Sequence, residues 1–206
     1  NSGEIQHRLS LKKYDFVVIQ PYSIEALELP ACFGDLDLGP TGRTKFLEFG
    51  EKIISLIRKN GAEPMIFEPW TYNTGHAWLK NDFECLRFAD GKTWYGDSLE
   101  AYRSRLHAGY RMLHERTDAE IIPVGDAWWS VRRDRRPGVP IEQLYENDNY
   151  HPTYFGAFLS ALVITEHLVN VPATKFAYQP KEVPPAKARY LKKIAEGYFS
   201  FETASR

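Results

Sequence analysis

The chain has 206 residues, 43% of them hydrophobic and 14% aromatic, which suits one globular domain with a sizeable core. The formal net charge is −1, with 26 Lys and Arg against 27 Asp and Glu, so no overall basic field points to nucleic acid. No stretch approaches the roughly 20 apolar residues of a membrane span. The two cysteines, Cys32 and Cys85, could form one disulfide or stay as thiols.

Apolar strand-like segments alternate with amphipathic helical ones along the chain. Tyr14–Gln20 is short, apolar and β-branched, which is typical of a strand buried on both faces. A helix capped by Thr44 is expected next, ending at Asn60 and Gly61. The further predicted elements are a buried strand over 64–70, a helix with Leu99, Tyr102, Leu106, Tyr110 and Leu113 on one face, a strand over 120–125, an apolar helix opened by Pro152 over 155–168, and a final helix over 186–199.

This alternation predicts an α/β fold with a parallel sheet covered by helices on both faces. Ligands in such folds bind outside the carboxyl ends of the strands. The loops after Gln20, Trp70 and Gly125 are therefore the first places to look for a site.

The stretch 146–157, ENDNYHPTYFGA, carries the strongest chemical signal. Asp148 is followed after two residues by His151 and Pro152, directly before an apolar helix. A carboxylate at this spacing can accept the imidazole Nδ1–H, fix the tautomer and leave Nε2 to act as a base. The structural alternative is that Asp148 caps the helix region and His151 packs against it.

The same stretch resembles the last conserved block of the SGNH (GDSL-type) hydrolases. Residues 15–23, DFVVIQPYS, and 122–128, IPVGDAW, resemble two strands of a bacterial branch of that family. The resemblance implies a three-layer, flavodoxin-like sandwich over 1–170, with the Pro-rich segment and helix of 171–206 packed on the same domain. It also implies ester hydrolysis through an acyl-enzyme, with Asp148 and His151 as two members of a Ser–His–Asp triad.

The letters Gly96-Asp97-Ser98-Leu99 spell the name of that family, but Ser98 does not follow a buried strand. Asp97 with Glu100 forms a capping-box pattern, so Ser98 is expected at a helix start. The family places its nucleophile after the first strand. That strand, with its Gly-x-Ser turn, is therefore expected upstream of Asn1, and Ser2 is a faint alternative.

The oxyanion donors are less visible, since the family's G-x-N-D turn is replaced here by Gln20-Pro21-Tyr22-Ser23. Gln20 or Ser23 could supply a donor, and Gln20 could equally satisfy a loop carbonyl. Trp70 is a candidate substrate contact, because aromatic rings suit the apolar face of a sugar; a tryptophan closing the rim of a core is the alternative.

These observations predict a serine esterase acting on a carbohydrate or other small ester, with no metal and no cofactor. Its implied location, by resemblance alone, is periplasmic or secreted, and the sequence does not define its oligomeric state. One alternative is a catalytically inactive SGNH-like module that binds glycans. Another is a hydrolase of anionic esters that uses the basic run Arg132–Arg136, expected as a loop, as a clamp. His107 and His114 lack carboxylate or cysteine partners at ligand spacing, so no metal site is expected there.

Overall fold

The computed structural model describes residues 2–27, 42–80, 93 and 98–199. They fall into two compact units, the first formed by residues 1–68 and 81–121 and the second by residues 69–80 and 122–206. The first unit contains α1 (Ser2–Ser10), β1 (Phe16–Ile19), η1 (Ser23–Ala26), α2 (Gly42–Lys59), β2 (Glu63–Phe67) and α4 (Leu99–Thr117). The division between the units falls within the residues of strand β3 (Glu120–Ile122). The second unit contains α3 (Ala77–Lys80), α5 (Val124–Arg133), η4 (Ile141–Leu144), α6 (Tyr154–Val169), η5 (Ala173–Lys175) and α7 (Pro185–Glu196).

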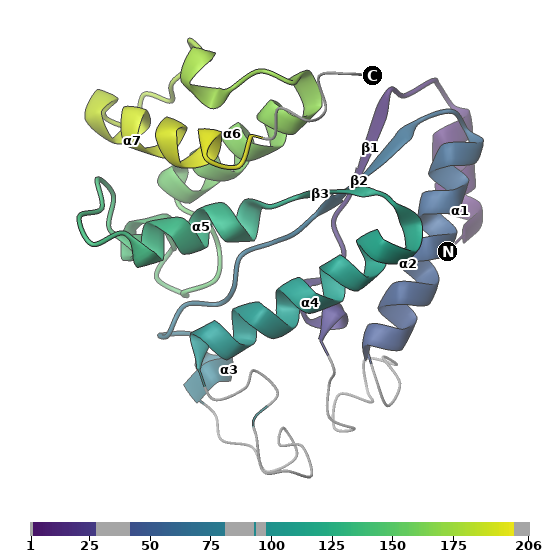
Figure 1. The fold of residues 1–206 in the computed structure, drawn as a ribbon, viewed down its shortest axis with the longest axis horizontal. Coiled ribbons are helices and arrows are strands. Elements are labelled where there is room, and N and C mark those ends of the chain that lie inside the picture. Colours follow the sequence, from purple (N-terminus) through teal and green to yellow (C-terminus); the bar gives the residue numbers. More distant parts are fainter. Residues whose placement is uncertain (1, 28–41, 81–92, 94–97, 200–206) are drawn as a thin grey trace. The chain divides into compact units, whose positions relative to one another are not determined.

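The strands form a three-stranded sheet in the order β1-β2-β3 (Figure 1). β1 and β2 are parallel, with Phe16 opposite Glu63 and Ile19 opposite Ile66. Strands separated by helices and joined in parallel confirm the predicted α/β class, and they are consistent with a flavodoxin-like sandwich.

Strand β1 differs from the prediction in its burial. Phe16 is 42% and Val18 37% exposed, whereas the last four residues of β2 are all buried. The reason is that β1 pairs only with β2 in the described sheet, while β2 has a neighbour on each side. An apolar run alone does not distinguish an edge strand from a central one.

Helices α2 and α4 each contribute large buried apolar side chains to the core of the first unit. Gly109 is required at their contact with η1, because a Cβ there would lie 2.1 Å from the carbonyl oxygen of Ala26. Helix α2 begins at Gly42, so Thr44 lies inside the helix and is not the predicted cap. The predicted stripe of α4 is confirmed, since Tyr102, Leu106, Tyr110 and Leu113 are all buried.

Trp128 of α5 is the largest buried side chain of the second unit, at 1% exposed. Its ring stacks on Trp70 at 4.2 Å between centroids and meets the edge of Tyr145 at 4.8 Å. Its indole N–H donates to Oγ of Ser160, 3.0 Å away, and that hydroxyl donates to the carbonyl of Gly156. Burial of this ring therefore comes without an unsatisfied indole N–H.

Two expectations for the second unit are wrong. Residues 124–133 form helix α5, so the basic run begins inside a helix, and only its second half follows it. Pro152 does not open α6, because it forms an isolated bridge with Tyr145, and the helix starts two residues later. No helix in the described part of the chain is long and apolar enough to cross a membrane.

Glu166 of α6 is a buried carboxyl, 0% exposed. One of its oxygens accepts the N–H of Ala173, while Oε2 has no hydrogen-bond partner among the described residues. Burial, reinforced by the charge of Glu196, raises the pKa of Glu166 to about 7.

This raised pKa predicts a pH-dependent stability. The folded protein holds the Glu166 proton more tightly than the unfolded chain, whose ordinary pKa is 4.5. The free energy of unfolding should therefore fall as the pH rises from about 4.5 to about 7 and level off above that. In urea titrations across this range, Glu166→Gln should remove a decline on the order of 1–3 kcal/mol. The exposed control Glu142→Gln should keep it, and an unchanged slope in Glu166→Gln would contradict the assignment.

Candidate active site

Asp148 and His151, the predicted catalytic pair, face each other in the loop before α6. Nδ1 of His151 lies 2.5 Å from Oδ2 of Asp148, and Oδ1 accepts the N–H groups of Tyr150 and His151 at 2.9 Å each. The bond from His151 and these two N–H groups lower the pKa of Asp148 to about 2. Since an ionised carboxylate only accepts hydrogen bonds, Nδ1 carries the proton and Nε2 is left as the basic nitrogen.

The loop holding this pair is closed on itself. The N–H of Glu146 donates to the carbonyl of His151 at 2.8 Å, and the N–H of Thr153 donates to that of Leu144 at 2.9 Å. Thr153 is the N-cap of α6, with Oγ1 accepting from two first-turn N–H groups. The cap of α6 is therefore Thr153 and not Asp148, whose Oδ1 accepts N–H groups of its own turn instead.

Residues 69–76 support this loop from the carboxyl side of β2. The indole N–H of Trp70 donates to the carbonyl of Tyr150 at 2.9 Å, and one face of the ring is stacked on Trp128. Tyr145 donates its hydroxyl to the carbonyl of Thr71, also at 2.9 Å, and burial raises the pKa of Tyr145, so this hydroxyl stays protonated. Trp70 is thus a support of the His151 loop, and its role as a substrate contact stays a prediction.

Four rings form a continuous row that ends at His151 of the predicted catalytic pair. His76 stacks on buried Tyr72 with 4.1 Å between the ring centroids. The ring of Tyr150 meets both edge-on, with its centroid 4.8 Å from that of Tyr72 and 5.9 Å from that of His76. The ring of Tyr150 also lies 4.7 Å from that of His151. Burial lowers the pKa of His76, and the charge of Asp148 opposes part of that shift. A second imidazole therefore lies in the same site and tends to be neutral.

Sequence reasoning did not predict Asn73 as a residue of this site, and it did not predict that Arg132 binds Asn73. Nη2 of Arg132 donates to Oδ1 of Asn73 at 2.7 Å, so the first residue of the basic run is engaged inside the protein. Arg133, Arg135 and Arg136 are exposed. The available signal was the Asn-x-Gly-His pattern of residues 73–76, in the loop that follows the buried strand β2.

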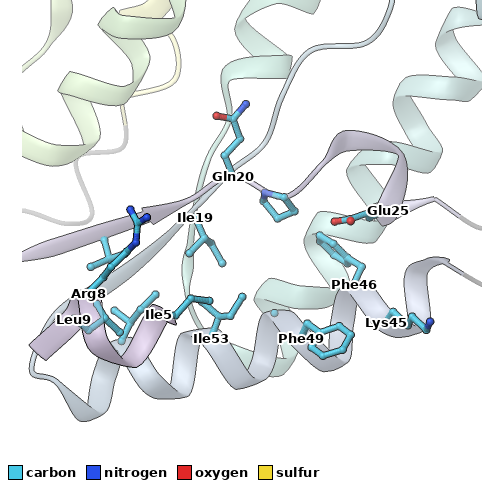
Figure 2. A pocket seen from close by; sticks show the side chains of 14 residues that line it. Ile5, Arg8, Leu9, Ile19, Gln20, Glu25, Lys45, Phe46, Phe49 and Ile53 are labelled. Atoms are coloured by element: carbon cyan, nitrogen blue, oxygen red, sulfur yellow. The ribbon is translucent and has the colours of Figure 1, made fainter. Parts of the chain in front are cut away.

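The two predicted oxyanion residues belong to the first unit. Gln20 is exposed at the end of β1 and Ser23 starts η1. Gln20 also borders a cavity of about 660 Å³, lined mostly by aliphatic and aromatic side chains (Figure 2). In that view its amide points away from the aliphatic side chains of Ile5, Leu9 and Ile53. The cavity therefore suits an apolar group, and the oxyanion role of Gln20 and Ser23 stays a prediction.

Ser98 is the N-cap of α4, with extended backbone angles and its Oγ accepting the N–H of Ala101 at 3.0 Å. This corrects the expected capping box, because the cap is Ser98 itself and not Asp97. Asp97 lies outside the described residues, as do Cys32, Cys85 and Trp94.

A cap of this kind predicts a modest loss of stability on truncation. Ser98→Ala should lower the free energy of unfolding by about 1 kcal/mol, because the N–H of Ala101 loses its partner. Ser98→Asp, which can cap in the same way, should lose only a few tenths of a kcal/mol. Urea unfolding measures both, and a Ser98→Ala protein as stable as the parent would contradict the capping role.

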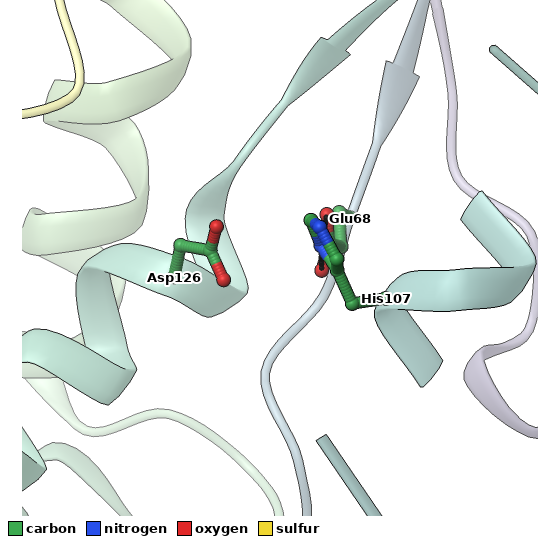
Figure 3. A group of neighbouring side chains, drawn as sticks. All are labelled: Glu68, His107 and Asp126. Atoms are coloured by element: carbon green, nitrogen blue, oxygen red, sulfur yellow. Dashed lines mark hydrogen bonds and ion pairs between the residues drawn. The ribbon is translucent and has the colours of Figure 1, made fainter. Parts of the chain in front are cut away.

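His107 has a carboxylate partner that its sequence neighbours do not reveal. Glu68, 2% exposed and placed directly after β2, has both carboxylate oxygens 3.0 and 3.1 Å from Nδ1 of His107 on α4 (Figure 3). The expectation that His107 lacks a carboxylate partner is wrong. The spacing of the sequence could not reveal this partner, because Glu68 and His107 are 39 positions apart. Asp126, drawn in the same view, belongs to the other unit. The two donors of the first unit alone are fewer than the three or four protein ligands of a zinc site.

Two solved structures are similar to this chain, and they support an SGNH-like α/β fold. A candidate SGNH hydrolase from Slackia heliotrinireducens is 21% identical in sequence, with a TM-score of 0.59. The match covers 82% of this chain and 73% of the Slackia chain. A DUF4886 family protein from Bacteroides uniformis is 19% identical, with a TM-score of 0.69. That match covers 96% of this chain and 67% of the Bacteroides chain. No protein-family model and no curated protein matches the sequence. At these identities the likeness shows the fold.

Proposed function

We propose that this chain carries the acid–base pair of a serine ester hydrolase. The observation that carries the proposal is the Asp148–His151 pair itself, with 2.5 Å between Oδ2 and Nδ1 and the His151 side chain 66% exposed. The imidazole is thus held by one nitrogen and accessible, which a general base requires. The SGNH-like neighbour supports hydrolase chemistry at the level of the fold.

The proposed reaction runs through an acyl-enzyme. A serine hydroxyl attacks the ester carbonyl carbon while Nε2 of His151 takes its proton, and Asp148 stabilises the imidazolium. The imidazolium then protonates the departing alcohol, leaving the acyl group on the serine. A water attacks this ester in the second half, again losing its proton to His151, and the acid is released as the serine is restored.

The nucleophile in this proposal is a serine upstream of Asn1, as the family resemblance implies. Ser98 is not a candidate, because its Oγ is engaged in capping α4. We keep Gln20 and Ser23 as candidate oxyanion donors.

The proposed substrate is a carbohydrate ester or another small ester, with acetyl as the first acyl group to test. The half-exposed rings of His76 and Tyr150 beside His151 support this choice, because aromatic surfaces suit the apolar face of a sugar. The anionic-ester alternative loses support, since Arg132 of the basic run is bonded to Asn73.

Acetate release by the intact gene product from acetylated sugars, with a phosphate monoester in parallel, tests the proposed function. We expect acetate and no phosphate, and the triple charge reversal of Arg133, Arg135 and Arg136 to glutamate should leave the rate within about twofold. Sugar binding without hydrolysis would overturn the esterase in favour of a glycan-binding module. Phosphate release that is lost in the triple variant would favour the anionic-ester hydrolase.

A further inference from the structure

Asn73 takes part in four hydrogen bonds, two of which join the two loops of the site. Its backbone N–H donates to the carbonyl of Asn149 at 2.9 Å, and its Nδ2 donates to Oδ1 of the same residue at 3.0 Å. Its carbonyl accepts the N–H of His76 at 2.9 Å, which closes the turn bearing the second imidazole. Its Oδ1 accepts Arg132. Asn73 is 5% exposed, and its amide is hydrogen-bonded at both ends within the protein, because Nδ2 donates to Asn149 and Oδ1 accepts from Arg132.

Arg132 is suited to clamp this amide. It lies in the last turn of α5, half-buried, with its guanidinium 5.9 Å from the ring centroid of Trp129. A charged donor at 2.7 Å gives a stronger bond than a neutral one. It also fixes which end of the Asn73 amide is oxygen, and therefore which end donates to Asn149.

The two loops lie so close that any side chain at Gly75 would push the Asn149 amide out of its place. A Cβ at Gly75 would lie 2.3 Å from Nδ2 of Asn149. Asn149 itself has a left-handed backbone, with φ of 59°, and follows Asp148 directly. A change at Asn149 is thus passed to Asp148 through one peptide unit, in a conformation that few residue types adopt without strain.

We propose that Asn73, held by Arg132, is the positioning residue that fixes the loop bearing Asp148 and His151. Its consequence for catalysis rests on the proposed esterase function. Without the two bonds between Asn73 and Asn149, the turn bearing Asp148 would loosen, and the bonds that Asp148 accepts from His151 and from the N–H groups of Tyr150 and His151 would weaken with it.

Arg132→Gln, with Arg133→Gln as its exposed neighbour on the same helix end, tests the proposal. The first readout is the pKa of Asp148, measured by carbon-13 NMR of its carboxyl in residues 1–206. Arg132→Gln should move it from about 2 towards its ordinary 3.8, and Arg133→Gln should leave it in place. Arg132→Lys, which keeps a charged donor, should restore part of the shift.

The second readout is hydrolysis by the intact gene product. Arg132→Gln should lower kcat about tenfold with KM changed less than twofold, because a misplaced base slows the chemistry more than binding. Gly75→Ala pushes on Asn149 without touching Arg132 and should shift both readouts in the same direction. This variant decides the matter if Arg132→Gln does not fold.

The outcomes separate the two proposals. If the parent protein hydrolyses no ester but Arg132→Gln still moves the pKa of Asp148, the proposed function fails and the positioning role stands. If folded Arg132→Gln and Gly75→Ala match Arg133→Gln in the Asp148 pKa and in kcat, the positioning role is overturned. A rise in KM alone would also overturn it.

Discussion

His151→Gln is expected to lower kcat/KM for ester hydrolysis by about 10³- to 10⁴-fold in the intact gene product. Glutamine keeps a polar side chain but has no nitrogen that can take and return a proton near neutral pH. The His151 side chain is 66% exposed, so the substitution should change the free energy of unfolding by less than about 0.5 kcal/mol. Steady-state kinetics and urea unfolding on the same preparations measure the two effects.

His7→Gln is a matched control, since His7 is also an exposed histidine near a helix end. It should retain full activity. Asp148→Asn should lower kcat/KM by less than His151→Gln and by more than His7→Gln. The reason is that an amide can still contact Nδ1 but does not stabilise an imidazolium. Its loss should appear in kcat more than in KM, and a His151→Gln enzyme of unchanged kcat/KM would contradict the assigned base.

Trp128→Ala is expected to cost about 3–5 kcal/mol of stability. The ring is 1% exposed, stacked on Trp70 and bonded to Ser160, so truncation leaves a large cavity and removes the N–H that Oγ of Ser160 accepts. Chemical denaturation followed by circular dichroism measures the loss. Because Trp70 also holds the carbonyl of Tyr150, the truncation should reduce activity in the protein that remains folded.

Tyr178→Ala is the control for this change, since Tyr178 is 73% exposed. It should alter the free energy of unfolding by no more than about 0.5 kcal/mol. Trp128→Phe keeps most of the ring volume and loses the bond to Ser160, so it should cost about 1–2 kcal/mol. A Trp128→Ala loss as small as that of Tyr178→Ala would contradict the role of this ring in the core.

Local patterns predicted much of this fold. The buried stripe of α4 repeats at helical spacing, and the apolar run of β2 is short and bounded by turn residues. The Asp148–His151 pair could be predicted for the same reason, since its two members are three residues apart. Helix α5 was missed although its buried residues Val124, Ala127, Trp128 and Val131 follow helical spacing. The Pro-Val-Gly start and the basic run had favoured a strand followed by a loop.

Contacts between distant residues could not be predicted in this way. Asn73 bonds to Asn149 across 76 positions, and Glu68 pairs with His107 across 39. Neither contact leaves a periodic trace in the sequence, because each depends on how strand ends and helix ends meet in space. The exposure of Phe16 could not be predicted either, because it depends on which strand lies beside β1 and not on the residues of β1.

The most direct test is labelling of the intact gene product with a fluorophosphonate, which modifies only activated serines, followed by peptide mapping. The mechanism predicts one modified serine other than Ser98, with labelling retained in Ser98→Ala and lost in His151→Gln. Modification of Ser98, or an intact, folded gene product that takes up no label, would contradict the proposed Ser–His–Asp mechanism.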